Sequence, residues 1–181
     1  MPTQTLSNST ALLARTPGAL DALLRELPEE WTKRNEGGSS WTVLEVMAHL
    51  VRTERKDWVP RARFILEHGN TQSLEPVIRD PNADGRPESV EALLDDFAAL
   101  RAANLEELRG MQLSPADLDK PGSHKALGPI RLSNLLATWV AHDLTHLHQI
   151  TRILAHQYRD KVGPFERFLG VLHCDGHSKP S

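Results

Sequence analysis

The sequence predicts an all-α fold, a four-helix bundle with one long crossover connection. Four stretches place apolar residues three and four positions apart, the period of a helix that buries one face. Period-2 alternation and enrichment in β-branched residues, which are typical of strands, are almost absent. The length of 181 residues fits one domain, so we expect a single helical domain over residues 1–181.

The first predicted helix runs from about residue 5 to residue 27. Its apolar stripe consists of leucines, namely Leu12, Leu13, Leu20, Leu23, Leu24 and Leu27. Thr16 and Pro17 interrupt this stripe, and the pair fits an N-cap followed by proline at the first helical position. The segment is therefore either two helices or one helix with a kink.

The second helix is predicted to begin after Thr42. Thr42 and Glu45 have the spacing of a capping box, in which each side chain bonds the other's backbone N–H. The apolar pattern continues toward Glu67. Pro60 lacks a backbone donor, so we expect a bend near Lys56, where the partner carbonyl would be left free.

A long connection and two further helices follow. Residues 69–88 contain three prolines and two glycines, and such a long link allows consecutive helices to run parallel. Ser89 can cap a third helix that ends at Gly110. The fourth spans about residues 132–158, although Arg131 is a poor N-cap residue. A short terminal helix is expected near residues 164–172.

Composition and charge exclude several classes of protein. Lys and Arg number 21 against 24 Asp and Glu, and the basic residues are scattered, so we expect no nucleic-acid partner. The longest apolar runs fall far short of the ~18 residues that a membrane span needs, so we expect no membrane partner. Cys174 is the single cysteine and the N-terminus lacks signal-peptide features, which favours the cytoplasm.

Two histidines on the fourth helix are candidate metal ligands. Four residues of a helix advance about 400°, which leaves His142 and His146 about 40° apart and about 6 Å along the axis. The apolar residues Leu135, Trp139 and Ile150 share this side, so the pair faces the bundle core. The spacing alone is a weak signal in a chain with nine histidines.

His49 strengthens the hypothesis. It borders the apolar stripe of the second helix and can approach the pair from across the bundle. Three imidazoles suit zinc, nickel, copper or iron(II), and three protein ligands leave the open position typical of catalytic sites. The sequence therefore predicts one divalent transition metal, preferably zinc or nickel, held by His49, His142 and His146.

The other metal-binding residue types are weaker candidates. His148 lies about 200° from His146 around the helix, and His156 lies about 21 Å along the axis from His142, so neither should reach the same ion. His124 precedes the fourth helix and is better explained as a solvent-facing loop residue. The run His173–His177 contains ligand types, but its spacing matches no established site.

Four residues are candidates for the surroundings of the metal. Glu45 lies one turn before His49, and Gln149 returns to within about 20° of His142, so either can hydrogen-bond a ligand. The capping box already explains Glu45, and Gln149 can equally be a satisfied core amide. Trp139 can wall the pocket or simply pack in the core. Asp143 lies about 100° off the ligand face and can be an exposed carboxylate.

Two segments carry a resemblance to a known family. With residues 41–50 opening the second helix and residues 142–150 on the fourth, the sequence resembles the DinB-like superfamily over nearly its whole length. The resemblance implies a four-helix bundle with a long connection, often dimeric. It also implies that the family's metal triad carries over onto His49, His142 and His146. Members include metal-dependent hydrolases and S-transferases that use a low-molecular-weight thiol.

The sequence leaves two classes of function open. The first is a metal-dependent enzyme acting on a small-molecule substrate, either a hydrolase that activates water or an S-transferase that activates a thiol cofactor. The second is a non-catalytic metal-binding or stress-associated bundle, in which the metal ties two helices together. No catalytic base is assigned. The resemblance also implies a homodimer, with Trp58 as a candidate exposed interface residue.

Overall fold

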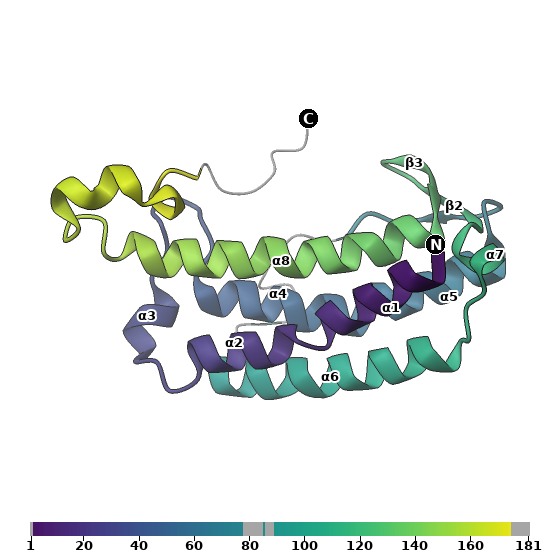
Figure 1. Ribbon diagram of the computed structural model, residues 1–181, viewed down its shortest axis with the longest axis horizontal. Helices are drawn as coiled ribbons and strands as arrows, with labels where there is room; N and C mark the ends of the chain where they lie inside the picture. Colours follow the sequence, from purple (N-terminus) through teal and green to yellow (C-terminus); the bar gives the residue numbers. More distant parts are fainter. Residues whose placement is uncertain (1, 78–84, 86–88, 175–181) are drawn as a thin grey trace.

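A computed structural model of the chain describes residues 2–77, 85 and 89–174. Its helices form four rods, two of which are broken in the middle (Figure 1). The rods are α1 (Pro2–Leu13) with α2 (Thr16–Leu24), α4 (Val43–Lys56) with α5 (Trp58–His68), α6 (Val90–Gly110) and α8 (Leu132–His156). The expected four-helix bundle is confirmed.

The connection between the second and third rods joins opposite ends of the bundle. Figure 1 shows that α4–α5 and α6 run in the same direction, whereas α1–α2 and α8 run in the opposite direction. Two consecutive rods are therefore parallel, an arrangement that the long connection was expected to allow. Two shorter helices, α3 (Glu29–Lys33) and α7 (Pro115–Leu118), lie at opposite ends of the bundle.

The break in the first rod follows from Pro17. Pro17 has no N–H for the carbonyl of Leu13, and α1 ends at that residue. The two-helix alternative is thus the right one, but the expected cap is wrong. Arg15 occupies the N-cap position of α2, and the hydroxyl of Thr16 bonds back to the carbonyl of Leu12 at 3.5 Å.

The other helix starts follow the predicted chemistry. The Oγ1 of Thr42 accepts from the backbone N–H of Glu45, and the carboxylate of Glu45 accepts from the N–H of Thr42, so the capping box is complete. The Oγ of Ser89 caps α6 by accepting from Ala92. At the start of α8 the Oδ1 of Asn134 accepts from the N–H of Arg131, which compensates for the poor cap. The expected bend in the second rod falls at Asp57.

Two short features differ from the sequence-based expectation. A small three-stranded sheet lies at one end of the bundle, in the order β1 (Ser73–Leu74), β2 (Pro121–His124) and β3 (Gly128–Arg131), with β1 parallel and β3 antiparallel to β2. These strands are too short to show a period of two. The short terminal helix expected near residues 164–172 is present, but as two 3₁₀ helices, η1 (Gly163–Phe168) and η2 (Gly170–Leu172), instead of one helix.

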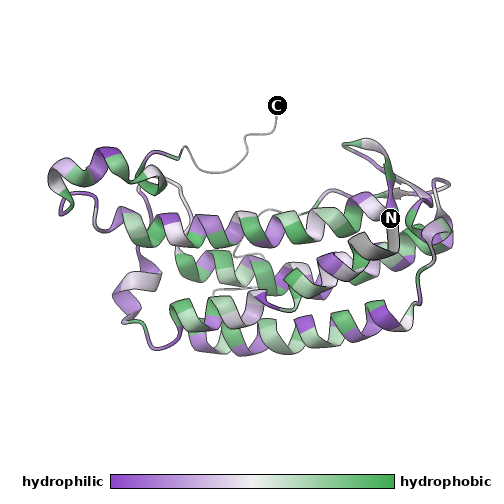
Figure 2. Cartoon of the chain, viewed as in Figure 1, coloured by the Kyte–Doolittle hydropathy of each residue, from purple (hydrophilic) through white to green (hydrophobic). Residues whose placement is uncertain are grey.

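The core divides into two apolar clusters along the bundle. One lies toward the sheet, around Trp58, Ala62, Leu105 and Trp139, and the other surrounds α2 and the start of α4. Figure 2 shows that each long helix carries both hydrophobic and hydrophilic residues. None of the described helices is long and apolar enough to cross a membrane.

Candidate metal centre

Three histidines from two rods converge beside the core. His49 lies on α4, and His142 and His146 lie one turn apart on α8. The Nε2 of His142 is 3.0 Å from the Nε2 of His49 and 3.1 Å from the Nε2 of His146. His49 and His146 are buried and His142 is half-buried, so His142 is the most exposed of the three. The structure therefore brings all three predicted residues together.

The tautomers of these rings leave lone pairs facing one another. Gln149 Oε1 lies 2.8 Å from Nδ1 of His146 and accepts its proton, so the Nε2 of His146 presents a lone pair. The Nε2 of His142 faces two such nitrogens and can donate to only one of them. A shared cation could accept a lone pair from each of the three Nε2 atoms, whereas one proton on the Nε2 of His142 can serve only one neighbour.

The spacing of the nitrogens fits a transition metal. Two imidazole nitrogens bound to zinc at 2.0–2.1 Å in tetrahedral geometry lie about 3.3 Å apart. The separations of His142 from His49 and from His146, 3.0 and 3.1 Å, differ from that value by only a few tenths of an ångström, and all three ligand atoms lie within 4.8 Å of one another. A set of three neutral imidazoles suits zinc, nickel, copper or iron(II).

Two tryptophans enclose the histidine triad. The ring of Trp41 lies 5.2 Å from that of His49 and is nearly parallel to that of His146 at 6.4 Å. Trp58 meets His142 edge to face at 5.0 Å and stacks on Trp139 at 5.8 Å. Trp139 thus packs behind Trp58, which in turn contacts His142. Trp58 is only 6% exposed, so its expected role as an exposed interface residue is wrong.

The polar candidates have different roles. Gln149 is buried and orients His146, as one of its two interpretations predicted. Glu45 belongs to the capping box, where its Oε2 also accepts from the hydroxyl of Thr42. Asp143 is 2% exposed, so the expected exposed carboxylate is wrong. Its oxygens face Arg101, a residue that the sequence analysis did not select.

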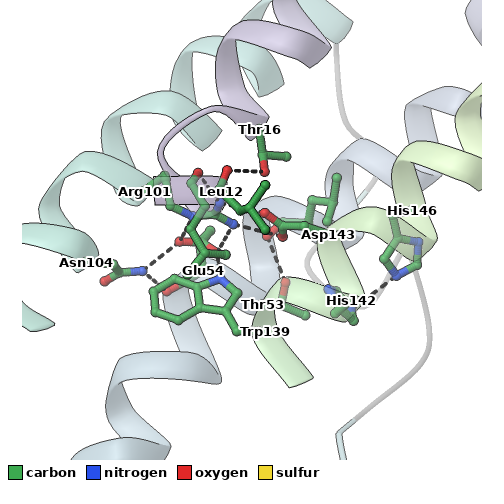
Figure 3. A network of polar contacts seen from close by, with 12 residues as sticks. Leu12, Thr16, Thr53, Glu54, Arg101, Asn104, Trp139, His142, Asp143 and His146 are labelled. Carbon is green, nitrogen blue, oxygen red and sulfur yellow. Dashed lines mark hydrogen bonds and ion pairs between the residues drawn. The ribbon is translucent and has the colours of Figure 1, made fainter. Parts of the chain in front are cut away.

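A buried ionic cluster adjoins the triad (Figure 3). The guanidinium of Arg101 bonds both oxygens of Glu54 at 2.8 and 3.1 Å and both oxygens of Asp143 at 2.6 and 2.9 Å. Glu54 also accepts from Nε1 of Trp139 and from the side-chain amide of Asn104. Burial works against the charge, but the bonds to both carboxylates raise the pKa of Arg101 above its usual value.

The pattern of the third helix contained a signal for this cluster. Arg101 lies four residues after Phe97 and four before Leu105, so it occupies the buried stripe of α6. A charged residue in such a stripe is rarely buried without a partner. The sequence could therefore have indicated a buried ion pair, but not which carboxylates form it.

The remaining histidines lie outside the triad. His148 is exposed and His156 half-buried on α8, and His124 lies on β2 with its Nδ1 accepting from Ala126. None of them belongs to the only group of potential ligands found among the described residues. Of the terminal run, His173 and Cys174 are described and do not join such a group, while residues 175–177 lie outside the described part.

Burial makes His142 hard to protonate. Desolvation, reinforced by His146, His49 and Arg101, lowers the pKa of His142 from 6.5 to about 2. At neutral pH the ring is therefore already in the neutral form that metal binding requires.

This pKa predicts a pH-dependent stability of the metal-free protein. Below pH 6.5 the unfolded state takes up a proton that folded His142 does not, so stability falls as the pH drops from 6.5 toward 2. The loss should be about 2 kcal/mol at pH 5. Urea unfolding of the wild type and His142→Gln at pH 7 and pH 5 measures it. An equal pH dependence in both proteins would contradict this account.

Gln149 offers a second test of the site. Gln149→Leu removes the acceptor that fixes the ring of His146, and such partners typically contribute about 10–100-fold to metal affinity. We expect a loss in that range in a chelator competition, with the fold intact by circular dichroism. Gln157→Leu, which alters the C-cap of the same helix far from the triad, is the control and should bind the metal normally.

The fold and the triad together define a class of protein, helical bundles with a candidate metal centre of three histidines. The sequence model of the DinB superfamily matches residues 12–150, more than half of the chain, and the protein therefore belongs to the DinB superfamily.

One solved structure extends this comparison. YfiT from Bacillus subtilis, described as "a probable metal-dependent hydrolase with an unusual four-helix bundle topology", matches with a TM-score of 0.71 at 19% sequence identity. The match covers 88% of this chain and 89% of YfiT. A search among curated proteins found no match. At this identity YfiT establishes the shared fold.

Proposed function

We propose that the protein is a metal-dependent hydrolase whose ion is held by His49, His142 and His146. The observation that carries the proposal is the convergence of three histidines from two rods, with two Nε2–Nε2 separations of 3.0 and 3.1 Å and all three ligand atoms within 4.8 Å of one another. The description of YfiT as a probable metal-dependent hydrolase supports the reaction type. Zinc or nickel is the preferred metal, one ion per chain.

The protein residues supply binding and orientation. A divalent ion with an open position polarises a carbonyl or phosphoryl oxygen and lowers the pKa of water toward neutrality. Gln149 holds His146 in the tautomer that presents Nε2, and Trp41 and Trp58 shield the histidines from bulk water. Asp143 is not available as a base because Arg101 engages both of its oxygens.

An exchangeable coordination position distinguishes the enzyme from a purely structural metal bundle. Protein loaded with Co²⁺ should change its visible absorption when acetohydroxamate, a bidentate metal ligand, is added. The loaded protein should also hydrolyse an activated ester such as 4-nitrophenyl acetate faster than its chelated form. An unchanged spectrum together with equal rates would favour the structural bundle. The same titration with cysteine as a model thiol tests the S-transferase alternative.

We also propose that the protein forms a homodimer in the cytoplasm. Superfamily membership supports this assembly, while the burial of Trp58 removes the residue that had been expected at the interface. Light scattering at micromolar concentration should give a mass of about twice 20.2 kDa. A mass near 20.2 kDa would show a monomer.

A further inference from the structure

The guanidinium of Arg101 has all five of its N–H groups engaged. The Nε–H and one N–H of Nη2 donate to Glu54. The other N–H of Nη2 and one N–H of Nη1 donate to Asp143. The second N–H of Nη1 donates to the carbonyl of Leu13 at 2.8 Å. Arg101 is 1% exposed. Arginine offers five donors in a fixed planar fork, whereas lysine offers three on a flexible stem. The site therefore fits arginine specifically.

The carbonyl of Leu13 that accepts this bond has no helical N–H partner. The N–H four residues later would normally bond this carbonyl, but that residue is Pro17. Arg101 supplies the missing donor from α6. The break in the first rod is thus tied to the same guanidinium, and Arg101, which lies on α6, bonds residues of the other three rods.

The partners of Arg101 lie next to the metal ligands. Glu54 is on α4, five residues after His49, and Asp143 directly follows His142 on α8. Figure 3 shows the cluster beside His142 and His146. A hydrogen bond of 2.9 Å from Trp139 to Glu54 joins the two ligand-bearing helices directly.

We propose that Arg101 is a positioning residue for the metal centre. By holding Glu54 and Asp143 in one plane, it fixes the separation and rotation of α4 and α8 at which His49 reaches the pair on α8. Arg101 itself touches neither the ion nor a substrate. The inference rests on the proposed metal centre, but not on the reaction that the centre catalyses.

Energetics favour a positional role over a purely stabilising one. Two carboxylates and one guanidinium are buried together, and replacing such a cluster by well-packed hydrophobic residues of similar volume is often neutral or stabilising. A cluster that contributes little net stability can still select one arrangement of the helices. Each carboxylate accepts two hydrogen bonds from the same planar guanidinium, so the cluster restricts both the distance and the angle between α4 and α8.

The test separates positioning from folding by removing the charges together. The variant Glu54→Gln, Arg101→Met, Asp143→Asn leaves no unpaired buried charge, so we expect a normal helical spectrum and a melting temperature between those of Arg101→Met and the wild type. Its affinity for Co²⁺, measured by chelator competition, should fall by about tenfold or more. The visible spectrum of bound Co²⁺ should change because the ligand geometry changes.

The matched control is a second arginine–carboxylate pair of α8, in which Arg152 is buried and Glu36 is half-buried. Arg152 bonds Glu36 through two contacts of 2.6 Å, and this pair joins α8 to the loop before α4. Replacing it with Met and Gln should leave both the Co²⁺ affinity and the Co²⁺ spectrum unchanged. Arg101→Lys is the second test variant. It keeps the positive charge but loses the two bidentate contacts, so its Co²⁺ spectrum should differ from that of the wild type.

Each outcome has a definite meaning. Wild-type affinity and spectrum in the triple variant would overturn the positioning role and leave the cluster merely structural. If the triple variant does not fold, a wild-type affinity and spectrum in Arg101→Lys would overturn the role equally. Absence of Co²⁺ uptake by the wild type would overturn the metal centre and the role of Arg101 with it.

Discussion

Replacing His142 by alanine is expected to lower the affinity for zinc or nickel by more than ~100-fold, since even partners of metal ligands contribute that much. The Nε2 of His142 lies between those of His49 and His146, so its loss removes the central nitrogen of the triad. The two remaining imidazole ligands should bind an ion weakly. His49→Ala and His146→Ala should have effects of similar size, measured by competition with a coloured chelator.

Two histidines of the same helix provide the controls. His148 is exposed and His156 lies more than three turns beyond His142, so their alanine variants should keep the metal. If His148→Ala released the metal while His49→Ala retained it, the cross-bundle site would be wrong.

Replacing Arg101 alone by methionine should lower the free energy of unfolding by about 3–5 kcal/mol. The substitution leaves Glu54 and Asp143 buried without their cation and deprives the carbonyl of Leu13 of its donor. A buried charge without a partner is costly, whereas the complete cluster is not. Urea unfolding of the metal-free variant measures this loss.

The charge-free triple variant is the matching comparison. It should recover most of the stability lost in Arg101→Met because no isolated charge remains. A single variant as stable as the wild type would show that water or another group compensates the two carboxylates. A triple variant as unstable as Arg101→Met would show that packing, and not charge, dominates at this site.

Local rules were sufficient for most of the fold. The apolar periods gave the four rods, and Pro17 and Pro60 marked both breaks because a missing N–H acts within one turn. The capping box at Thr42 and the cap at Ser89 depend on residues three positions apart. The small sheet could not be predicted, because β1 is two residues long and pairs with a strand far along the chain.

The three histidines could also be predicted from local helix geometry, but the residues around them could not. The angle between His142 and His146 is fixed by the helix alone, and the position of His49 on its apolar stripe placed it toward the core. The direction of Asp143 depends on Arg101, which lies on another helix. The burial of Trp58 depends on Trp139 and on the contacts of α5 with α8, which no local pattern contains.

Metal analysis of protein prepared without a histidine tag tests the central claim most directly. Inductively coupled plasma mass spectrometry of the wild type, after dialysis against metal-free buffer and reconstitution with zinc or nickel, should find about one ion per chain. The His49→Ala, His142→Ala and His146→Ala variants should contain almost none. A wild-type protein with an intact helical spectrum and no metal uptake would contradict the metal centre.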